Sequence, residues 1–189
     1  MADRTDPKRA DKEAASREEP AAGTPSADTG WNWPLPAMPH VPGATPRPDE
    51  SQAIFRIART APAPTDAARW RDNSAWMAGL RLYRAGFFWE AHEVWEAVWA
   101  HARPNSPERM LAQGVIQLAN AGLKQRMGRP GAALRLAELA RAHLDDVAGG
   151  ASHRVMGLDP RALAEATAAY ARALAEGAEA PVPLLEIAD

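Results

Sequence analysis

The feature that most constrains the fold is a helical spacing of apolar residues, which continues with short breaks from residue 51 to residue 176. Apolar side chains recur every three to four positions, as on one face of an α-helix, and no alternating pattern typical of a β-strand occurs. The spacing predicts helices over 51–59, 67–85, 88–102, 107–127, 130–147 and 160–176. The predicted fold class is all-α, a compact bundle of about five helices built from antiparallel pairs.

Residues with strong preferences for helix boundaries support these limits. Ser106 and Asp159 each precede a proline, a combination that starts a helix with a side-chain cap and a first residue that needs no N–H partner. Gly86 and Gly128 end two predicted helices and lie in loosely similar sequences, AGFFWEAHEVWEAVW and MGRPGAALRLAELAR. This weak repeat predicts two helix pairs of similar construction. The apolar end of the chain, APVPLLEIAD, is expected to pack on the bundle in an extended form.

Residues 1–50 have a different composition. They hold nine of the seventeen prolines and almost no aliphatic residues. Such a segment buries too little apolar surface to offset its chain entropy, so it is predicted to be a disordered Pro-rich tail in front of a helical domain at 51–189. Trp31 and Trp33 lie in its extended second half. Either they fold back and cover an apolar patch on the domain, or they form a linear motif that docks a partner protein.

The composition argues against several classes of function. The chain has 189 residues, a net charge of −2 and no cysteine, which disfavours a nucleic-acid-binding surface, a disulfide scaffold and Cys-ligated zinc. No apolar run approaches the roughly 20 residues of a membrane span, and the N-terminus lacks the apolar stretch of a signal peptide. We therefore expect a cytoplasmic protein that binds neither membrane nor nucleic acid. Its richness in Ala and Arg is typical of a GC-rich bacterial genome.

The stretch FFWEAHEVWEAVW at 87–99 concentrates aromatic and ionisable residues on one predicted helix. On a helical wheel the core face is an arc about 140° wide. This arc holds Phe88, Ala91, Val94, Trp95, Val98, Trp99 and Ala102. Glu90 and Glu93 lie opposite, and they are predicted to be solvated or paired with arginines of a neighbouring helix. His92 lies at the edge of the arc, and Glu96 follows it by one turn, so these two side chains are predicted to pair.

Two interpretations of His92 and Glu96 stay open. Either Glu96 only pairs with an imidazole that covers Trp99, or the two side chains ligate a metal or line a small-molecule site. The sequence HEVWE departs from the zinc motif H-E-x-x-H at its last residue. Trp89 stands where the E-x-x-H pattern of di-iron bundles has Glu. A metal would need further ligands from another helix.

The helix predicted at 107–127 carries one polar stripe on an otherwise apolar surface. The stripe consists of Arg109, Gln113, Gln117, Asn120 and Lys124. It is either a solvent-facing side or a half-buried seam whose amides bond to His92, Glu93 or Glu96. The candidate functional residues are therefore Glu90, His92, Glu93, Glu96, Gln113 and Gln117.

The core of the chain resembles a family known as domain of unknown function 309, which occurs in bacteria and plastids. The family hallmark is a Gly–aromatic turn followed by E-A-H-E-x-W/L-E-x-x-W. It is matched here by Gly86, Phe87, Phe88, Glu90, Ala91, His92, Glu93, Trp95, Glu96 and Trp99. The resemblance spans about residues 74–145 and implies a compact all-α bundle. It implies no activity, so the hallmark residues are carried over without a role.

Two functions are consistent with these features. The first is a binding or scaffold module with a polar seam around His92 and Glu96, favoured by the paired helices and by the lack of a complete catalytic motif. It would bind a protein partner or form a homodimer. The second is a metal-dependent hydrolase, or another enzyme, that uses His92, Glu93 and Glu96 with Gln113 and Gln117. The sequence assigns no cofactor to either.

Overall fold

A computed structural model describes residues 33–150, 154–178 and 180–187. The helices in these ranges are α1 (Ala53–Ala58), the 3-10 helix η1 (Ala67–Asp72), α2 (Ser74–Arg84), α3 (Phe88–His101), α4 (Pro107–Arg126), α5 (Pro130–Gly150) and α6 (Pro160–Ala175). No β-strand occurs in the described ranges, where an isolated bridge pairs Val155 with Leu158. The all-α prediction is confirmed. None of the described helices combines the length and the apolar composition that crossing a membrane requires.

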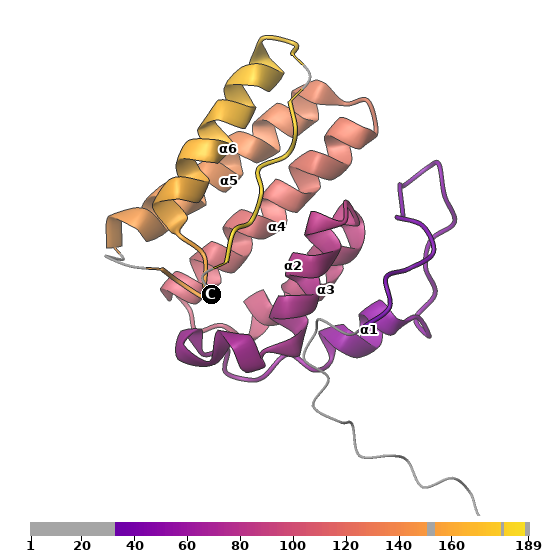
Figure 1. The fold of residues 1–189 in the computed structure, drawn as a ribbon, viewed down its shortest axis with the longest axis vertical. Coiled ribbons are helices and arrows are strands. Elements are labelled where there is room, and N and C mark those ends of the chain that lie inside the picture. The colour runs from indigo at the N-terminus through magenta and orange to yellow at the C-terminus, as the bar shows by residue number, and fades with distance from the viewer. Residues whose placement is uncertain (1–32, 151–153, 179, 188–189) are drawn as a thin grey trace, which may run out of the picture.

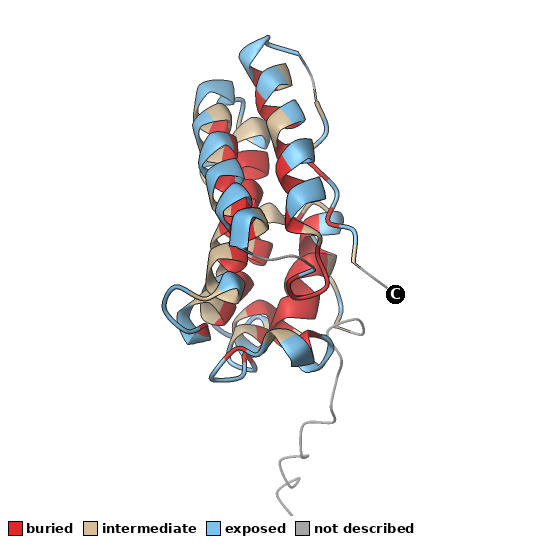
Figure 2. Ribbon diagram, turned by 90° about the vertical axis from the view of Figure 1, so that its left-hand side faces the viewer, coloured by how far each residue is buried: buried red, intermediate tan, exposed pale blue. Residues whose placement is uncertain are grey.

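Helix α4 lies at the centre of the bundle. It packs against α3 on one side and α5 on the other, while α2 packs on α3 and α6 on α5. Successive long helices run antiparallel (Figure 1). Buried residues line the inner sides of the helices and exposed residues their outer sides (Figure 2). The short helix α1 packs on α3 at the edge of the bundle.

The local sequence explains where the helices begin and end. Ser106 and Asp159 accept N–H bonds from the first turns of α4 and α6, as predicted. At Gly86 and Gly128, φ is +80° and +67°, a left-handed conformation that glycine adopts without steric cost. The residue after each glycine donates its N–H to a carbonyl five residues back, at 2.8 and 2.9 Å. The two helix pairs therefore share one turn geometry.

The helix predicted at 67–85 is two elements, η1 and α2. Asn73 separates them, with an extended backbone at φ −82° and ψ 92°. Its side chain accepts the N–H of Trp76 at 2.9 Å, and the residue is only 1% exposed. An N-cap residue is not itself helical, so the cap that starts α2 also ends η1.

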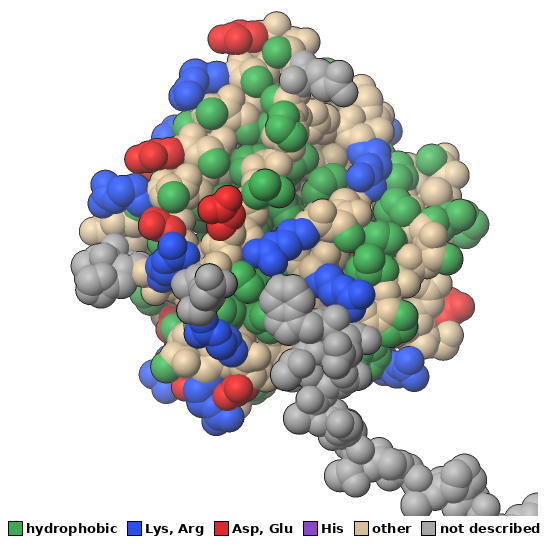
Figure 3. Space-filling model, viewed as in Figure 1, with side chains coloured by type: hydrophobic (Ala, Val, Ile, Leu, Met, Phe, Trp, Pro, Cys, Tyr) green, Lys and Arg blue, Asp and Glu red, His purple; other side chains and the backbone are tan. Residues whose placement is uncertain are grey.

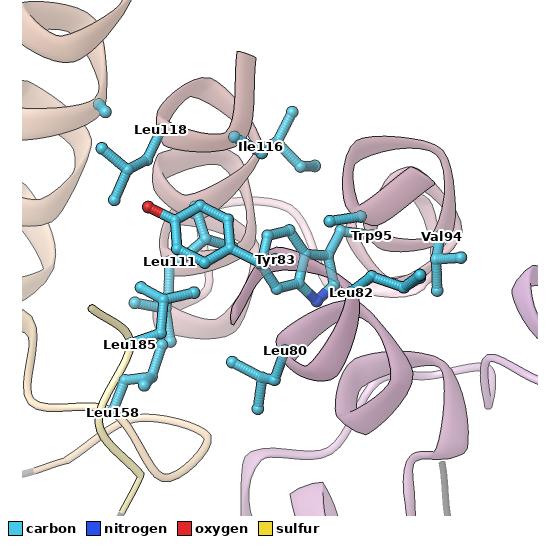
Figure 4. Close-up of a cluster of buried hydrophobic side chains, with 14 of the residues drawn as sticks. Leu80, Leu82, Tyr83, Val94, Trp95, Leu111, Ile116, Leu118, Leu158 and Leu185 are labelled. Atoms are coloured by element: carbon cyan, nitrogen blue, oxygen red, sulfur yellow. The ribbon is translucent and has the colours of Figure 1, made fainter. Parts of the chain in front are cut away.

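Aliphatic side chains and the rings of Tyr83 and Trp95 pack together in the core between α2, α3 and α4 (Figure 4). The ring centroids of Trp76 and Tyr83 lie 5.7 and 5.8 Å from that of Trp95. A Cβ atom at Gly79 would lie 2.1 Å from Trp95 Nε1. Glycine at this position is therefore what allows α2 to approach the indole on α3.

Residues 180–187 pack on the bundle in an extended form, as predicted (Figure 1). Side chains of the bundle hold their carbonyl groups. Tyr83 Oη donates to the oxygen of Pro183 at 2.9 Å, and Gln125 Nε2 donates to that of Ala180 at 2.8 Å. The end of the chain thus follows the bundle through main-chain contacts.

Residues 33–48, here called the N-terminal segment, also lie against the domain. Trp33 and Leu35 pack on the core, and His40 is 7% exposed. The prediction of a disordered tail is wrong for these residues. Their few apolar side chains pack in a groove between α1 and α2, which cannot be derived from the composition of the segment. The alternative in which Trp33 folds back onto the domain is confirmed. Trp31 and the other residues of 1–32 lie outside the described residues.

Candidate functional site

Helix α3 is covered on two sides. Its predicted core face packs in the bundle, and the N-terminal segment and α1 lie over its opposite side. There Trp89 is 8% exposed and Glu90 is 0% exposed, while Glu93 is half-buried. Of the two alternatives predicted for Glu90, solvation is therefore wrong, and its hydrogen bond within the described residues goes to the backbone of His40 and not to an arginine. The helical wheel placed Glu90 correctly, opposite the bundle core, but another part of the chain covers that side.

The Glu90 carboxylate binds the main chain of the N-terminal segment. Its Oε1 accepts the backbone N–H of His40 at 2.7 Å. Its Oε2 is buried and has no hydrogen-bond partner among the described residues. Burial raises the pKa of Glu90, and the His40 N–H and the charge of Arg126 offset only part of this effect. One carboxylate oxygen of Glu90 therefore accepts a hydrogen bond from the N-terminal segment, and the other could accept a further hydrogen bond on this side of α3.

A turn in the N-terminal segment positions the His40 N–H. The imidazole packs edge-on against the indole of Trp89, with the ring centroids 4.8 Å apart. His40 Nδ1 lies 3.1 Å from Thr45 Oγ1, and the same hydroxyl accepts the N–H of Val41 at 2.8 Å. These contacts hold the turn over 41–45 together and fix the backbone of His40 beside Glu90.

Upstream of His40 the N-terminal segment lies in a shallow apolar groove between α1 and α2. The groove is lined by Ala53, Ile54, Ile57, Ala78, Arg81 and Leu82. Trp33 and Leu35 contact it, and the Arg81 guanidinium donates to the carbonyl oxygen of Trp33. Hydrophobic side chains gather on the right of Figure 3, where Figure 1 places the N-terminal segment. Side chains of α2 and α3 therefore bind the main chain of the segment at two points, with apolar contacts between them.

His92 pairs with Glu96, as predicted, with 3.0 Å between His92 Nε2 and Glu96 Oε1. Its other nitrogen, Nδ1, lies 3.7 Å from Glu93 Oε1, which is too far for a hydrogen bond. Burial raises the pKa of Glu93, and the neighbouring charges of His92 and Arg47 offset part of this effect. Glu93, His92 and Glu96 form an acid–imidazole row at the margin of the surface that the N-terminal segment covers.

The acid–imidazole row does not have the arrangement of a metal site. Its two carboxylates lie at opposite nitrogens of the imidazole, whose lone pairs diverge, so one ion cannot bind all three side chains. Across the ranges that the structure describes, no group of three or more His, Cys, Asp or Glu residues could hold a metal ion. His92 and Glu96 together would supply two ligands at most.

The polar stripe of α4 is half-buried and is joined to α3 through Trp99. Gln113 Oε1 accepts from Trp99 Nε1 at 3.3 Å. Arg109 donates to the carbonyls of Trp99 and Ala102 at 3.0 and 3.1 Å, and its guanidinium carbon lies 4.0 Å from the Trp99 ring centroid. Neither Gln113 nor Gln117 bonds to the acid–imidazole row in the described part of the chain. The stripe therefore supports the C-terminal end of α3 and not the row.

Sequence reasoning missed His40, Thr45 and Trp89 as parts of this site. His40 acts through its backbone N–H, which any residue except proline supplies, so its side chain gave no signal. Trp89 gave one, because a large aromatic residue opposite the core face of a helix indicates a second contact surface. That signal could have placed a further segment of the chain over Glu90.

These features define an all-α domain in which a motif-bearing helix lies between a bundle core and an extended segment. Residues 76–136 match the family model described as Domain of unknown function (DUF309), so the chain contains a DUF309 domain. The matched range includes all six candidate residues, whereas the N-terminal segment lies outside it. No curated protein and no solved structure matches the chain.

Proposed function

We propose that the chain is a binding module for another polypeptide. Its binding surface, here called the Glu90 face, consists of α1, the last turn of α2 and the side of α3 that carries Trp89 and Glu90. The observation that carries the proposal is the 2.7 Å bond from the His40 N–H to the buried Glu90 carboxylate. A side chain that binds a main-chain N–H recognises an extended peptide largely independently of its sequence.

The burial of Glu90 supports this proposal. Carboxylates are rarely buried without compensating partners, because removing the charge from water is unfavourable. Glu90 is fully buried, yet one of its two carboxylate oxygens has no hydrogen-bond partner among the described residues. A perturbed, buried acid at a surface contact is a general indicator of a functional site.

The layout of the Glu90 face also resembles that of protein interfaces in general, with an apolar centre and a polar margin. The groove between α1 and α2 supplies the apolar part. The acid–imidazole row, with Glu96 56% exposed, supplies polar groups at the margin. In this proposal His92 and Glu96 contribute to recognition and have no catalytic role.

The alternative, a metal-dependent hydrolase that uses His92, Glu93 and Glu96, has less support. The geometry allows only one of the two carboxylates to share an ion with His92. Of the two residues proposed to assist, Gln113 and Gln117, the first bonds to Trp99 instead. No specific observation favours hydrolysis over binding.

The proposal is tested by fluorescence anisotropy with the full chain and labelled peptides. The panel contains extended Pro-rich peptides and, as a control, an Ala-rich helical peptide. We expect at least one extended peptide to bind saturably to a His40→Pro chain, whose own segment cannot donate to Glu90. Glu90→Ala in that chain should weaken the binding by about tenfold or more through loss of the hydrogen bond to the peptide. Glu138→Ala, which removes an exposed acid on α5, is the matched control and should leave it nearly unchanged. The proposal fails if every extended peptide binds no better than the helical one.

A further inference from the structure

We infer that residues 33–48 are a built-in ligand of the Glu90 face, and that the partner is an extended peptide with the same recognition features. These features are an aromatic–x–aliphatic pair of anchors and, five residues after the aliphatic one, a residue with a free backbone N–H. The inference rests on the proposed function and names its ligand. The resident segment competes with that ligand for one site.

The anchors follow from the groove between α1 and α2. Trp33 and Leu35 are both half-buried there, with the exposed Pro34 between them. The Arg81 guanidinium bonds to the Trp33 carbonyl, which any extended peptide also offers. The Arg56 guanidinium carbon lies 5.8 Å from the centroid of the Trp33 ring, within reach of a cation–π contact. An aromatic residue is thus favoured at the first anchor position.

The N–H requirement follows from Glu90. Its Oε1 accepts the N–H of His40, so a proline at that position of a ligand would leave the buried acceptor without a donor. Six of the sixteen residues in the N-terminal segment are prolines, and His40 lies between Pro39 and Val41. The segment therefore combines a stiff extended backbone with a free N–H at the one place where the face binds it.

The resident segment is an incomplete ligand. Glu90 Oε2 is wholly buried and has no donor in the described residues. Between its anchors and His40 the segment leaves two side chains uncovered, with Ala37 exposed and Met38 59% exposed. A partner that places a hydrogen-bond donor at Oε2 would satisfy the carboxylate better and would displace the segment.

Competition between the resident segment and a partner has a measurable consequence. Because residues 49–52 connect the segment directly to α1, its effective concentration at the Glu90 face is high. A free peptide then binds only the fraction of molecules in which the segment has left the face. Weakening the segment should therefore strengthen the binding of a peptide in trans.

The test uses the full chain and a fluorescein-labelled peptide with the sequence of residues 33–48. His40→Pro in the chain removes the N–H that binds Glu90, and Trp33→Ala removes the aromatic anchor while keeping the backbone carbonyl that Arg81 binds. We expect each variant to bind the peptide about tenfold more tightly than the wild-type chain does. Met38→Ala, which changes an exposed side chain of the same segment, is the matched control and should bind as the wild type does. Circular dichroism establishes that each variant keeps its helices.

The same peptide carrying His40→Pro provides the second arm and should lose most of its binding to every chain. If the wild-type, His40→Pro and Trp33→Ala chains bind the unaltered peptide equally, the segment is not a competitor and this inference is wrong, whereas the proposed function stands. If the altered and unaltered peptides bind equally, the N–H requirement is wrong. If other extended peptides bind the Glu90 face and this peptide does not, the ligand class is wrong while the proposed function again stands.

Discussion

Glu90 binds a residue that lies fifty positions earlier in the sequence, His40. It belongs to α3, yet its hydrogen bond goes to the backbone of the N-terminal segment. Burial raises its pKa, so the folded protein holds a proton on Glu90 at a pH where the unfolded chain has lost it. Ionisation of this one side chain therefore works against the folded state.

The pH dependence of stability should report this ionisation. The folded state binds more protons than the unfolded state as pH rises above about 4.3, where an ordinary Glu titrates, so the free energy of unfolding falls through the folded pKa. Glu90→Gln cannot ionise and keeps an amide oxygen that can accept the His40 N–H. We expect urea unfolding of this variant to show a flatter decline in stability with rising pH.

Glu93 continues to contribute to the slope, because burial raises its pKa too. The decline should therefore become smaller in Glu90→Gln without disappearing. An unchanged profile in Glu90→Gln would contradict the burial of this carboxylate.

Gly79 of α2 lies directly against the indole of Trp95. A methyl group there would lie 2.1 Å from Trp95 Nε1, and Trp95 is 0% exposed and unable to move away. Gly79→Ala should therefore destabilise the fold, at the upper end of the roughly 1–3 kcal/mol typical of overpacking. Gly131→Ala, in α5, meets no atom within 4 Å and should be neutral or stabilise by up to about 1 kcal/mol. Thermal unfolding of both variants measures the difference, and equal effects would contradict the close contact of α2 with α3.

At the scale of the helices, α3 depends on a neighbour for its C-terminal end. Arg109 donates from one nitrogen to the carbonyls of Trp99 and Ala102 and stacks on the Trp99 ring. The last carbonyls of a helix lack partners within it, and a cation placed there satisfies both the bonds and the helix dipole. The polar stripe of α4 therefore begins with a residue that caps α3.

Arg109→Ala should destabilise the fold by about 1–2 kcal/mol, because it leaves two helix-end carbonyls without their donor. Arg135→Ala on α5 removes an exposed arginine and should change stability by less than about 0.5 kcal/mol. Urea unfolding measures the free energy of unfolding of both variants, provided that its dependence on urea concentration is the same as in the wild type. Equal stability of the two variants would show that Arg109 does not cap α3.

The helices were predictable because their limits depend on neighbours in sequence. Ser106 and Asp159 cap the residues that follow them directly, and Gly86 and Gly128 close turns through bonds within six residues. Asn73 could not be recognised as a break, because a buried cap is distinguished from a mid-helix Asn only by its tertiary surroundings. The apolar spacing simply continues through it.

At the scale of the whole molecule, both ends of the described chain are extended segments held by side chains of the bundle. Arg81 binds a carbonyl near the start of the N-terminal segment, and Tyr83 binds one near the end of the chain. Both residues belong to the last turn and a half of α2. The end of α2 therefore binds both the N-terminal segment and residues 180–187.

The candidate site was predictable only in part, for a reason that belongs to this scale. The pairing of His92 with Glu96 is one helical turn and could be derived from spacing. The burial of Glu90 depends on a segment fifty residues away in sequence. The hydrogen bond between them uses a backbone N–H, which the amino-acid composition does not reveal. A wheel gives the direction of a side chain but does not show what covers it.

The N-terminal segment lies on the Glu90 face and is bound there through the His40 N–H. Amide hydrogen exchange of the full chain, followed by NMR, tests this bond directly. We expect the His40 amide to exchange slowly in the wild type, Glu90→Ala to remove its protection and Glu96→Ala to preserve it. Exchange of the His40 amide in the wild type at the rate of an unprotected amide would show that its N–H is not bound to Glu90.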